Sequence, residues 1–170
     1  MTEQRSVSLD TMIVLLVDDD IDHLEIAQVN LEETDPSLRV SSVTTPEECL
    51  ELLDEKHFDC IVSDYQMPRI DGISLASKIR ETNDIPFILY TGKGSEEVAE
   101  TAFAVGIDDY IRKEANSSHF QVLAKRIISA IERKRAVDDL KRSEAQSRLF
   151  LESGMDGVSL VVDSKLVYVN

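Results

Sequence analysis

The sequence has few cysteines and no long hydrophobic run. Its two cysteines, Cys49 and Cys60, lie in separate predicted elements, so we expect two buried thiols rather than a disulfide or a metal site. The longest apolar run, residues 12–17, is far shorter than the roughly 20 residues that a transmembrane helix needs. The N-terminus also lacks a basic region followed by a hydrophobic stretch, the pattern of a secretion signal. These absences predict a cytoplasmic segment without a membrane partner.

Basic residues are also scarce. The chain has 18 Lys and Arg against 33 Asp and Glu, which gives a formal net charge of -15 at pH 7. Proteins that bind nucleic acid directly need clustered basic residues to neutralise phosphates. The charge balance therefore argues against a direct nucleic-acid partner. The 42% of hydrophobic residues is ordinary for a domain that buries a core.

Strand-like and helix-like patterns alternate along most of the chain. Short apolar runs, typical of strands covered on both faces, alternate with segments of helical spacing, and breaks such as Asp35-Pro36 separate them. Five such units predict an α/β fold, in which a parallel sheet carries helices on both faces. The predicted strands are residues 12–17, 38–43, 59–63, 87–90 and 109–112, and the predicted helices are 21–32, 46–56, 72–80, 96–104 and one that begins near 118.

Polar residues directly follow four of the predicted strands. The carboxyl ends of parallel strands meet at one edge of a sheet, where open α/β sheets bind ligands. Clustered carboxylates repel one another, and a divalent cation or an ammonium group relieves that repulsion. A carboxylate can also attack phosphorus as a nucleophile. The pattern predicts a magnesium site that accepts a phosphoryl group. The residues are Asp18, Asp19 and Asp20 after the first strand, Asp64 after the third, Thr91 after the fourth and Lys113 after the fifth.

Several of these residues also have plainer interpretations. Asp20 is expected to cap the first helix, which leaves Asp18 and Asp19 to a metal. Thr91 alone could begin a turn, and Lys113 alone could be a surface charge. The histidines lie on separate elements without ligand spacing, so we expect surface or half-buried positions rather than a metal or phosphohistidine site. They are His23, His57 and His119.

Four short motifs occur in order along residues 10–133. Each is weak singly, but their order and spacing together are highly specific. They are Val17-Asp18-Asp19-Asp20, Ser63-Asp64-Tyr65-Gln66-Met67-Pro68 followed by Asp71-Gly72, Tyr90-Thr91-Gly92, and Asp109-Tyr110-Ile111-Arg112-Lys113. On these motifs the segment resembles a receiver domain of the two-component response-regulator family. The resemblance implies a flavodoxin-like, doubly wound (βα)5 fold with strand order 2-1-3-4-5.

The resemblance also implies a phosphorylation site. Asp64 would accept a phosphoryl group from a histidine kinase. Asp18 and Asp19 would bind Mg²⁺ together with Asp64, and the backbone carbonyl of Gln66 would complete the protein ligands. The implied chemistry of this segment is limited to its own aspartyl phosphorylation and dephosphorylation.

The same resemblance implies a conformational switch. Thr91 and Lys113 would contact the phosphate as catalytic residues. Thr91 and Tyr110 would also be the switch residues, whose movement alters the surface formed by residues 96–112 and the last helix. Tyr110 could equally be a packing residue. The family usually has proline after the lysine, in a cis peptide, whereas Glu114 stands here. A cis bond before a residue other than proline costs about 2.5–4 kcal/mol, so we expect a trans peptide and a differently shaped loop.

The C-terminal residues differ from the rest. Residues 132–144 are charged and lack Gly and Pro, which predicts that the last helix continues as a linker helix over residues 134–149. A solvated single helix and pairing into a homodimer both remain open. Residues 150–170 resemble the opening of a PAS sensor domain, with two strands joined at Asp163-Ser164. Because an isolated hairpin is marginal in water, we expect the truncated start of a PAS domain in a longer protein, with a histidine kinase as one continuation. Residues 1–9 are expected to form a tail.

Two other functions fit parts of the pattern. In a phosphatase of the haloacid-dehalogenase type, Asp18 and Asp20 would be nucleophile and acid, with Thr91 and Lys113 downstream. That interpretation leaves Asp64 without a role and places the acidic pair Asp108-Asp109 before the lysine instead of after it. The other alternative is a receiver that binds protein partners without being phosphorylated.

Overall fold

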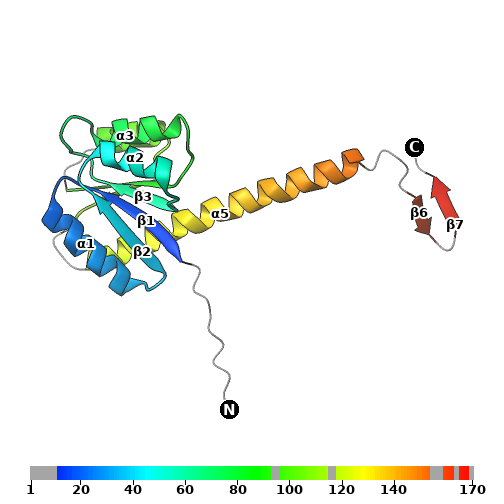
Figure 1. Cartoon of the computed structure of the whole chain (residues 1–170), viewed down its shortest axis with the longest axis horizontal. Coiled ribbons are helices and arrows are strands. Elements are labelled where there is room, and N and C mark those ends of the chain that lie inside the picture. Colours follow the sequence, from blue (N-terminus) through cyan, green and yellow to red (C-terminus); the bar gives the residue numbers. More distant parts are fainter. Residues whose placement is uncertain (1–10, 93–95, 115–117, 154–158, 163–164, 169–170) are drawn as a thin grey trace, which may run out of the picture. The chain divides into compact units, whose positions relative to one another are not determined.

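The computed structural model describes residues 11–92, 96–114, 118–153, 159–162 and 165–168. The first strands and helices are β1 (Met12–Val17), α1 (Ile21–Thr34), β2 (Leu38–Val43), α2 (Pro46–Glu55), β3 (Cys60–Ser63) and α3 (Gly72–Arg80). They are followed by β4 (Phe87–Thr91), α4 (Glu96–Ala104), β5 (Asp109–Arg112) and α5 (Ser118–Ser153). The five strands pair in parallel in the order β2-β1-β3-β4-β5, and Figure 1 shows β2, β1 and β3 side by side within this sheet. The predicted α/β fold, its strand order and the extended C-terminal helix are confirmed.

The sheet has a hydrophobic core on each face. Successive strand residues point to opposite faces, so Leu16 of β1 packs with α1 and α5, while Leu15 packs with α2, α3 and α4. This double coverage explains why β1 is apolar throughout rather than alternating. Cys49 and Cys60 are buried free thiols, as predicted.

The register of the central strands brings their polar ends together. Val17 of β1 pairs with Ser63 of β3, so both strands end at the same level of the sheet. The next residues, Asp18 and Asp64, therefore leave the sheet side by side. The backbone N–H of Asp64 donates to the carbonyl of Val17 at 2.8 Å, which extends the pairing into the site.

The first helix begins where the sequence predicts. Asp20 has an extended backbone, and its carboxylate accepts a hydrogen bond from the N–H of His23 at 3.1 Å. This contact satisfies one of the free N–H groups at the helix start. The predicted capping role of Asp20 is confirmed, and the cap determines where the first turn of α1 lies beside the end of β1.

The chain divides into two compact units, Met1–Glu132 and Arg133–Asn170. The second contains the C-terminal part of α5 and two strands, β6 (Ser159–Val162) and β7 (Lys165–Tyr168), which pair antiparallel as predicted. The predicted tail over residues 1–9 and the connection Asp163-Ser164 lie outside the described residues. No helix in the described part of the chain is both long and apolar enough to cross a membrane.

Candidate functional site

Two carboxylates and one ammonium group meet at the carboxyl edge of the sheet. The Nζ of Lys113, which follows β5, lies 2.6 Å from Oδ2 of Asp18 and 3.0 Å from Oδ1 of Asp64. The side chains of Asp18 and Asp64 are only 7% and 10% exposed, and that of Lys113 is 20% exposed. Charges with so little access to water interact more strongly than surface ion pairs. The structure thus brings together three residues that the sequence places at three different strand ends.

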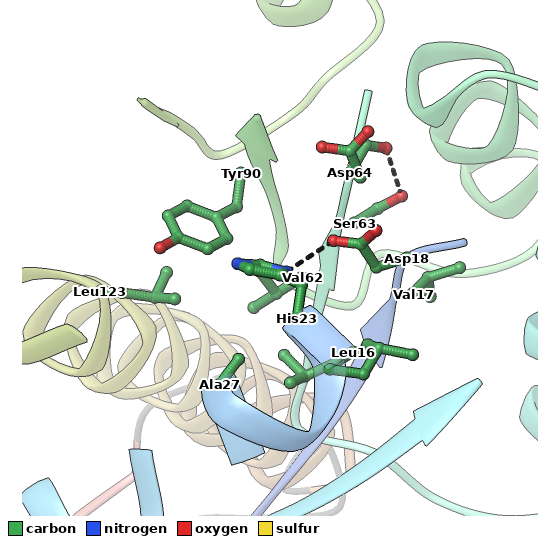
Figure 2. A pocket seen from close by; sticks show the side chains of 11 residues that line it. Leu16, Val17, Asp18, His23, Ala27, Val62, Ser63, Asp64, Tyr90 and Leu123 are labelled. Atoms are coloured by element: carbon green, nitrogen blue, oxygen red, sulfur yellow. Dashed lines mark hydrogen bonds and ion pairs between the residues drawn. The ribbon is translucent and has the colours of Figure 1, made fainter. Parts of the chain in front are cut away.

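Asp18 is the most heavily bonded member of the site. Its Oδ1 accepts from the N–H of Asp20 at 3.0 Å, and its Oδ2 accepts from Lys113 at 2.6 Å. Oδ2 also lies 2.8 Å from Nδ1 of His23, a contact shown in Figure 2. Burial alone would raise the pKa of Asp18. The hydrogen bonds from His23, Lys113 and the Asp20 backbone, with the charge of Lys113, outweigh burial and lower this pKa to about 2. Asp18 is therefore ionised at neutral pH.

Asp64 is held by the loop that follows β3. Its Oδ2 accepts from the N–H of Gln66 at 2.7 Å, which leaves Oδ1 toward Lys113. The loop then passes so close to α3 that a Cβ on Gly72 would collide with the Asp64 carbonyl oxygen and lie 2.7 Å from a methyl group of Leu89. Glycine is required there because the backbone approaches so closely.

The other residues predicted for the site lie around this cluster in different ways. The side chain of Asp19 is exposed. Thr91 is buried at the end of β4, and its carbonyl accepts from the N–H of Lys113 at 2.9 Å. Tyr110 packs against the core on the α4 side, and its buried hydroxyl has no hydrogen-bond partner among the described residues. The peptide between Lys113 and Glu114 is trans, as predicted.

The oxygen donors at this edge of the sheet suit Mg²⁺. Mg²⁺ prefers oxygen ligands and typically binds one or two carboxylates while keeping several waters. Asp18 and Asp64 supply two such carboxylates at one place, because both contact the same ammonium group. Among the described residues, no group of three or more His, Cys, Asp or Glu side chains is arranged to hold a metal. Asp18 and Asp64 are therefore the part of the predicted ligand set that the structure already brings together, and they fit a Mg²⁺ ion that keeps several waters.

Sequence reasoning missed the contact between His23 and the site. His23 is half-buried, as expected, but it lies against Asp18 and next to the ring of Tyr90, with ring centroids 5.7 Å apart. The Tyr90 centroid is also 5.6 Å from the Nζ of Lys113. The sequence did contain one signal of this contact, namely the predicted helix cap at Asp20. A cap accepts a hydrogen bond from the backbone N–H three residues later, here that of His23, and so keeps His23 close to the end of β1.

Comparison with known proteins agrees with this geometry. The family described as response regulator receiver domain matches residues 14–125. The transcriptional regulatory protein SrrA of Staphylococcus aureus (strain NCTC 8325 / PS 47) is 30% identical over 139 residues, covering 82% of this chain and 55% of that protein. The chain thus spans about half the length of the curated relatives that it matches.

Solved structures show the same architecture. A response regulator receiver domain protein from Clostridium thermocellum superposes with a TM-score of 0.66 at 26% identity, covering 74% of this chain and 98% of that one. The receiver domain of a signal transduction histidine kinase from Syntrophus aciditrophicus gives a TM-score of 0.61 at 28% identity, covering 72% and 94%.

Proposed function

The chain belongs to the response regulator receiver domain family of two-component signalling, and on that basis we propose that Asp64 accepts a phosphoryl group from a histidine kinase with the help of Mg²⁺. The observation that carries this proposal is the shared contact of Lys113 with Asp18 and Asp64, at 2.6 and 3.0 Å. This contact places the positively charged ammonium group of Lys113 next to the Asp64 carboxylate, which would react. Family membership also argues against the phosphatase alternative.

The proposed reaction is a direct transfer to a carboxylate. An Asp64 oxygen attacks phosphorus while the bond between phosphorus and the donor histidine nitrogen breaks, and that nitrogen keeps the electron pair. Lys113 neutralises charge on the phosphoryl oxygens. Asp18, Asp19, Asp64 and the carbonyl of Gln66 would hold Mg²⁺, which supplies further charge neutralisation when bound. Thr91 would donate a hydrogen bond to the attached phosphoryl group.

Phosphorylation would then shift a conformational equilibrium. The new charge and acceptor oxygens draw Thr91 toward Asp64, and the ring of Tyr110 occupies the space that Thr91 leaves. Thr91 lies on β4 and Tyr110 lies on β5, so the change reaches the α4–β5–α5 surface. Tyr110 packs inward, and its hydroxyl has no partner within the described part of the chain. Both features support a ring that can change position at little cost in hydrogen bonds.

The wider protein is also part of the proposal. We expect the receiver to act in a longer, cytoplasmic signalling protein, in which residues 134–149 link it to a PAS domain that begins near residue 150 and a histidine kinase is one continuation. The antiparallel pair of β6 and β7 supports the PAS start. Val137, Leu140 and Leu149 on α5 are 44%, 60% and 65% exposed, which supports a homodimer formed through this helix.

The test is phosphorylation in solution. The chain is incubated with acetyl phosphate and Mg²⁺, and its intact mass is measured for wild type, Asp64→Asn and Asp54→Asn, a matched change at an exposed aspartate of α2. We expect one phosphoryl adduct in the wild type and in Asp54→Asn, and none in Asp64→Asn. An adduct that persists in Asp64→Asn would overturn the assignment. A wild type that forms no adduct would favour the phosphorylation-independent binding module.

A further inference from the structure

Among the described residues, the imidazole of His23 is one of three donors that hold the Asp18 carboxylate. An ionised carboxylate can only accept hydrogen bonds, so the 2.8 Å contact means that Nδ1 of His23 donates to Oδ2 of Asp18. Oδ2 also accepts from Lys113 at 2.6 Å, and Oδ1 accepts from the N–H of Asp20 at 3.0 Å. Of these donors, the Asp20 N–H belongs to the backbone and Lys113 is shared with Asp64. His23 is therefore the side chain dedicated to Asp18.

His23 is held through both its backbone and its ring. The backbone N–H donates to the Asp20 cap at 3.1 Å, and the ring faces that of Tyr90 at 5.7 Å with an interplanar angle of 32°. Tyr90 in turn stacks on His119 of α5, at 5.9 Å and 26°. Figure 2 shows the His23 ring between the Tyr90 ring and the Asp18 carboxylate, with the Tyr90 hydroxyl directed away from that carboxylate. Tyr90 thus supports His23 through its ring.

We propose that His23 is a positioning residue for Asp18, which it holds in the orientation needed to bind the cation, with Tyr90 as the support behind it. The inference rests on the proposed function, because it takes Asp18 as a cation ligand. Hydrogen bonds from outside the ligand shell orient metal-binding side chains, and losing one typically costs about 10- to 100-fold in metal affinity. Without His23, Asp18 keeps Lys113 and the Asp20 N–H as donors, so the carboxylate is held less firmly in the orientation that the cation needs.

The test measures Mg²⁺ binding directly, without a phosphodonor. Isothermal titration calorimetry on the full chain compares wild type with His23→Leu and His23→Asn. Leucine keeps apolar bulk against Tyr90 but cannot donate, so we expect about tenfold weaker Mg²⁺ binding. The side-chain amide nitrogen of asparagine can take the place of Nδ1, so His23→Asn is expected to bind within about threefold of wild type. Rescue by asparagine separates hydrogen-bond donation from packing.

A second measurement separates cation binding from chemistry. The rate of adduct formation on Asp64 with acetyl phosphate is followed as a function of Mg²⁺ concentration. In His23→Leu we expect the Mg²⁺ concentration for half-maximal rate to rise about tenfold, while the maximal rate stays near that of wild type. His57→Leu is the matched control, because the His57 side chain is 82% exposed and His57 precedes β3, at the other end of that strand. Thermal unfolding by circular dichroism checks that each variant is folded.

The outcomes distinguish a failure of this inference from a failure of the proposed function. Unchanged Mg²⁺ affinity in His23→Leu, in a chain whose wild type binds Mg²⁺ and is phosphorylated, would overturn the role of His23 and leave the proposed function intact. Equal weakening in the leucine and asparagine variants would show that His23 acts by packing, and it would also overturn the inference. A wild type that neither binds Mg²⁺ nor forms the adduct would overturn both proposals together.

Discussion

Replacing Lys113 by methionine removes the charge that joins the two buried carboxylates. Methionine keeps an unbranched chain of similar length, so the change deletes the ammonium group with little loss of packing. In the wild type this group lies 2.6 Å from Asp18 and 3.0 Å from Asp64, whose side chains are 7% and 10% exposed. Without Lys113, two carboxylates with little access to water would face each other, and we expect a lower free energy of unfolding.

The structure sets the size of this loss. Removing one partner of a fully buried ion pair typically costs about 3–5 kcal/mol. Lys113 is 20% exposed, and each carboxylate keeps at least one backbone N–H donor, from Asp20 or Gln66. The expected loss is therefore smaller, about 2–3 kcal/mol at neutral pH. Because Mg²⁺ would neutralise the same two carboxylates, we expect it to stabilise Lys113→Met more than the wild type.

The assay is urea unfolding at pH 7, with and without millimolar Mg²⁺. Far-ultraviolet circular dichroism is the suitable signal, because the chain contains no tryptophan. Lys56→Met changes an exposed lysine and serves as the control, with an expected effect of less than about 0.5 kcal/mol. A loss no larger than this control in Lys113→Met would refute the reasoning. Equal stabilisation of both chains by Mg²⁺ would show that the ammonium group and the cation do not compete for the same carboxylates.

Two further predictions concern acid stability and the loop after β3. Burial works against the ionised form of Asp18, but the hydrogen bonds to it hold its pKa at about 2, below the 3.8 of a free carboxyl. The ionised Asp18 therefore contributes about 2 kcal/mol to the free energy of unfolding above about pH 4, and this contribution is lost as the pH falls toward 2. In urea unfolding at several pH values, the stability of Asp18→Asn should fall less on acidification than that of the wild type. An equal fall in both proteins would contradict the lowered pKa of Asp18. Gly72→Ala places a methyl group against the Asp64 carbonyl, so we expect a loss of about 1–3 kcal/mol in thermal or urea unfolding, and a neutral effect would show that the loop can move.

The alternation of strands and helices could be derived from the sequence because it depends on local patterns. The apolar run of β1 and the helical spacing of α1 are properties of adjacent residues, and each element lies within a few residues of its predicted limits. Parallel strands then place their carboxyl ends at one edge, whatever the details of packing. This topological rule is why Asp18, Asp64 and Lys113 could be assigned to one site before any distance was known.

The pairing of individual atoms in that site could not be derived in this way. Asp18 and Asp19 are neighbours with the same side chain, yet Asp18 is buried against Lys113 and His23 while Asp19 is exposed. Which of them turns inward depends on the direction of the backbone as it leaves β1. The contact of His23 depends on the cap at Asp20 and on Tyr90, which is far away in the sequence. Local patterns place residues on elements, whereas hydrogen bonds between side chains require a donor and an acceptor within about 3 Å, and that proximity arises only when distant segments pack together.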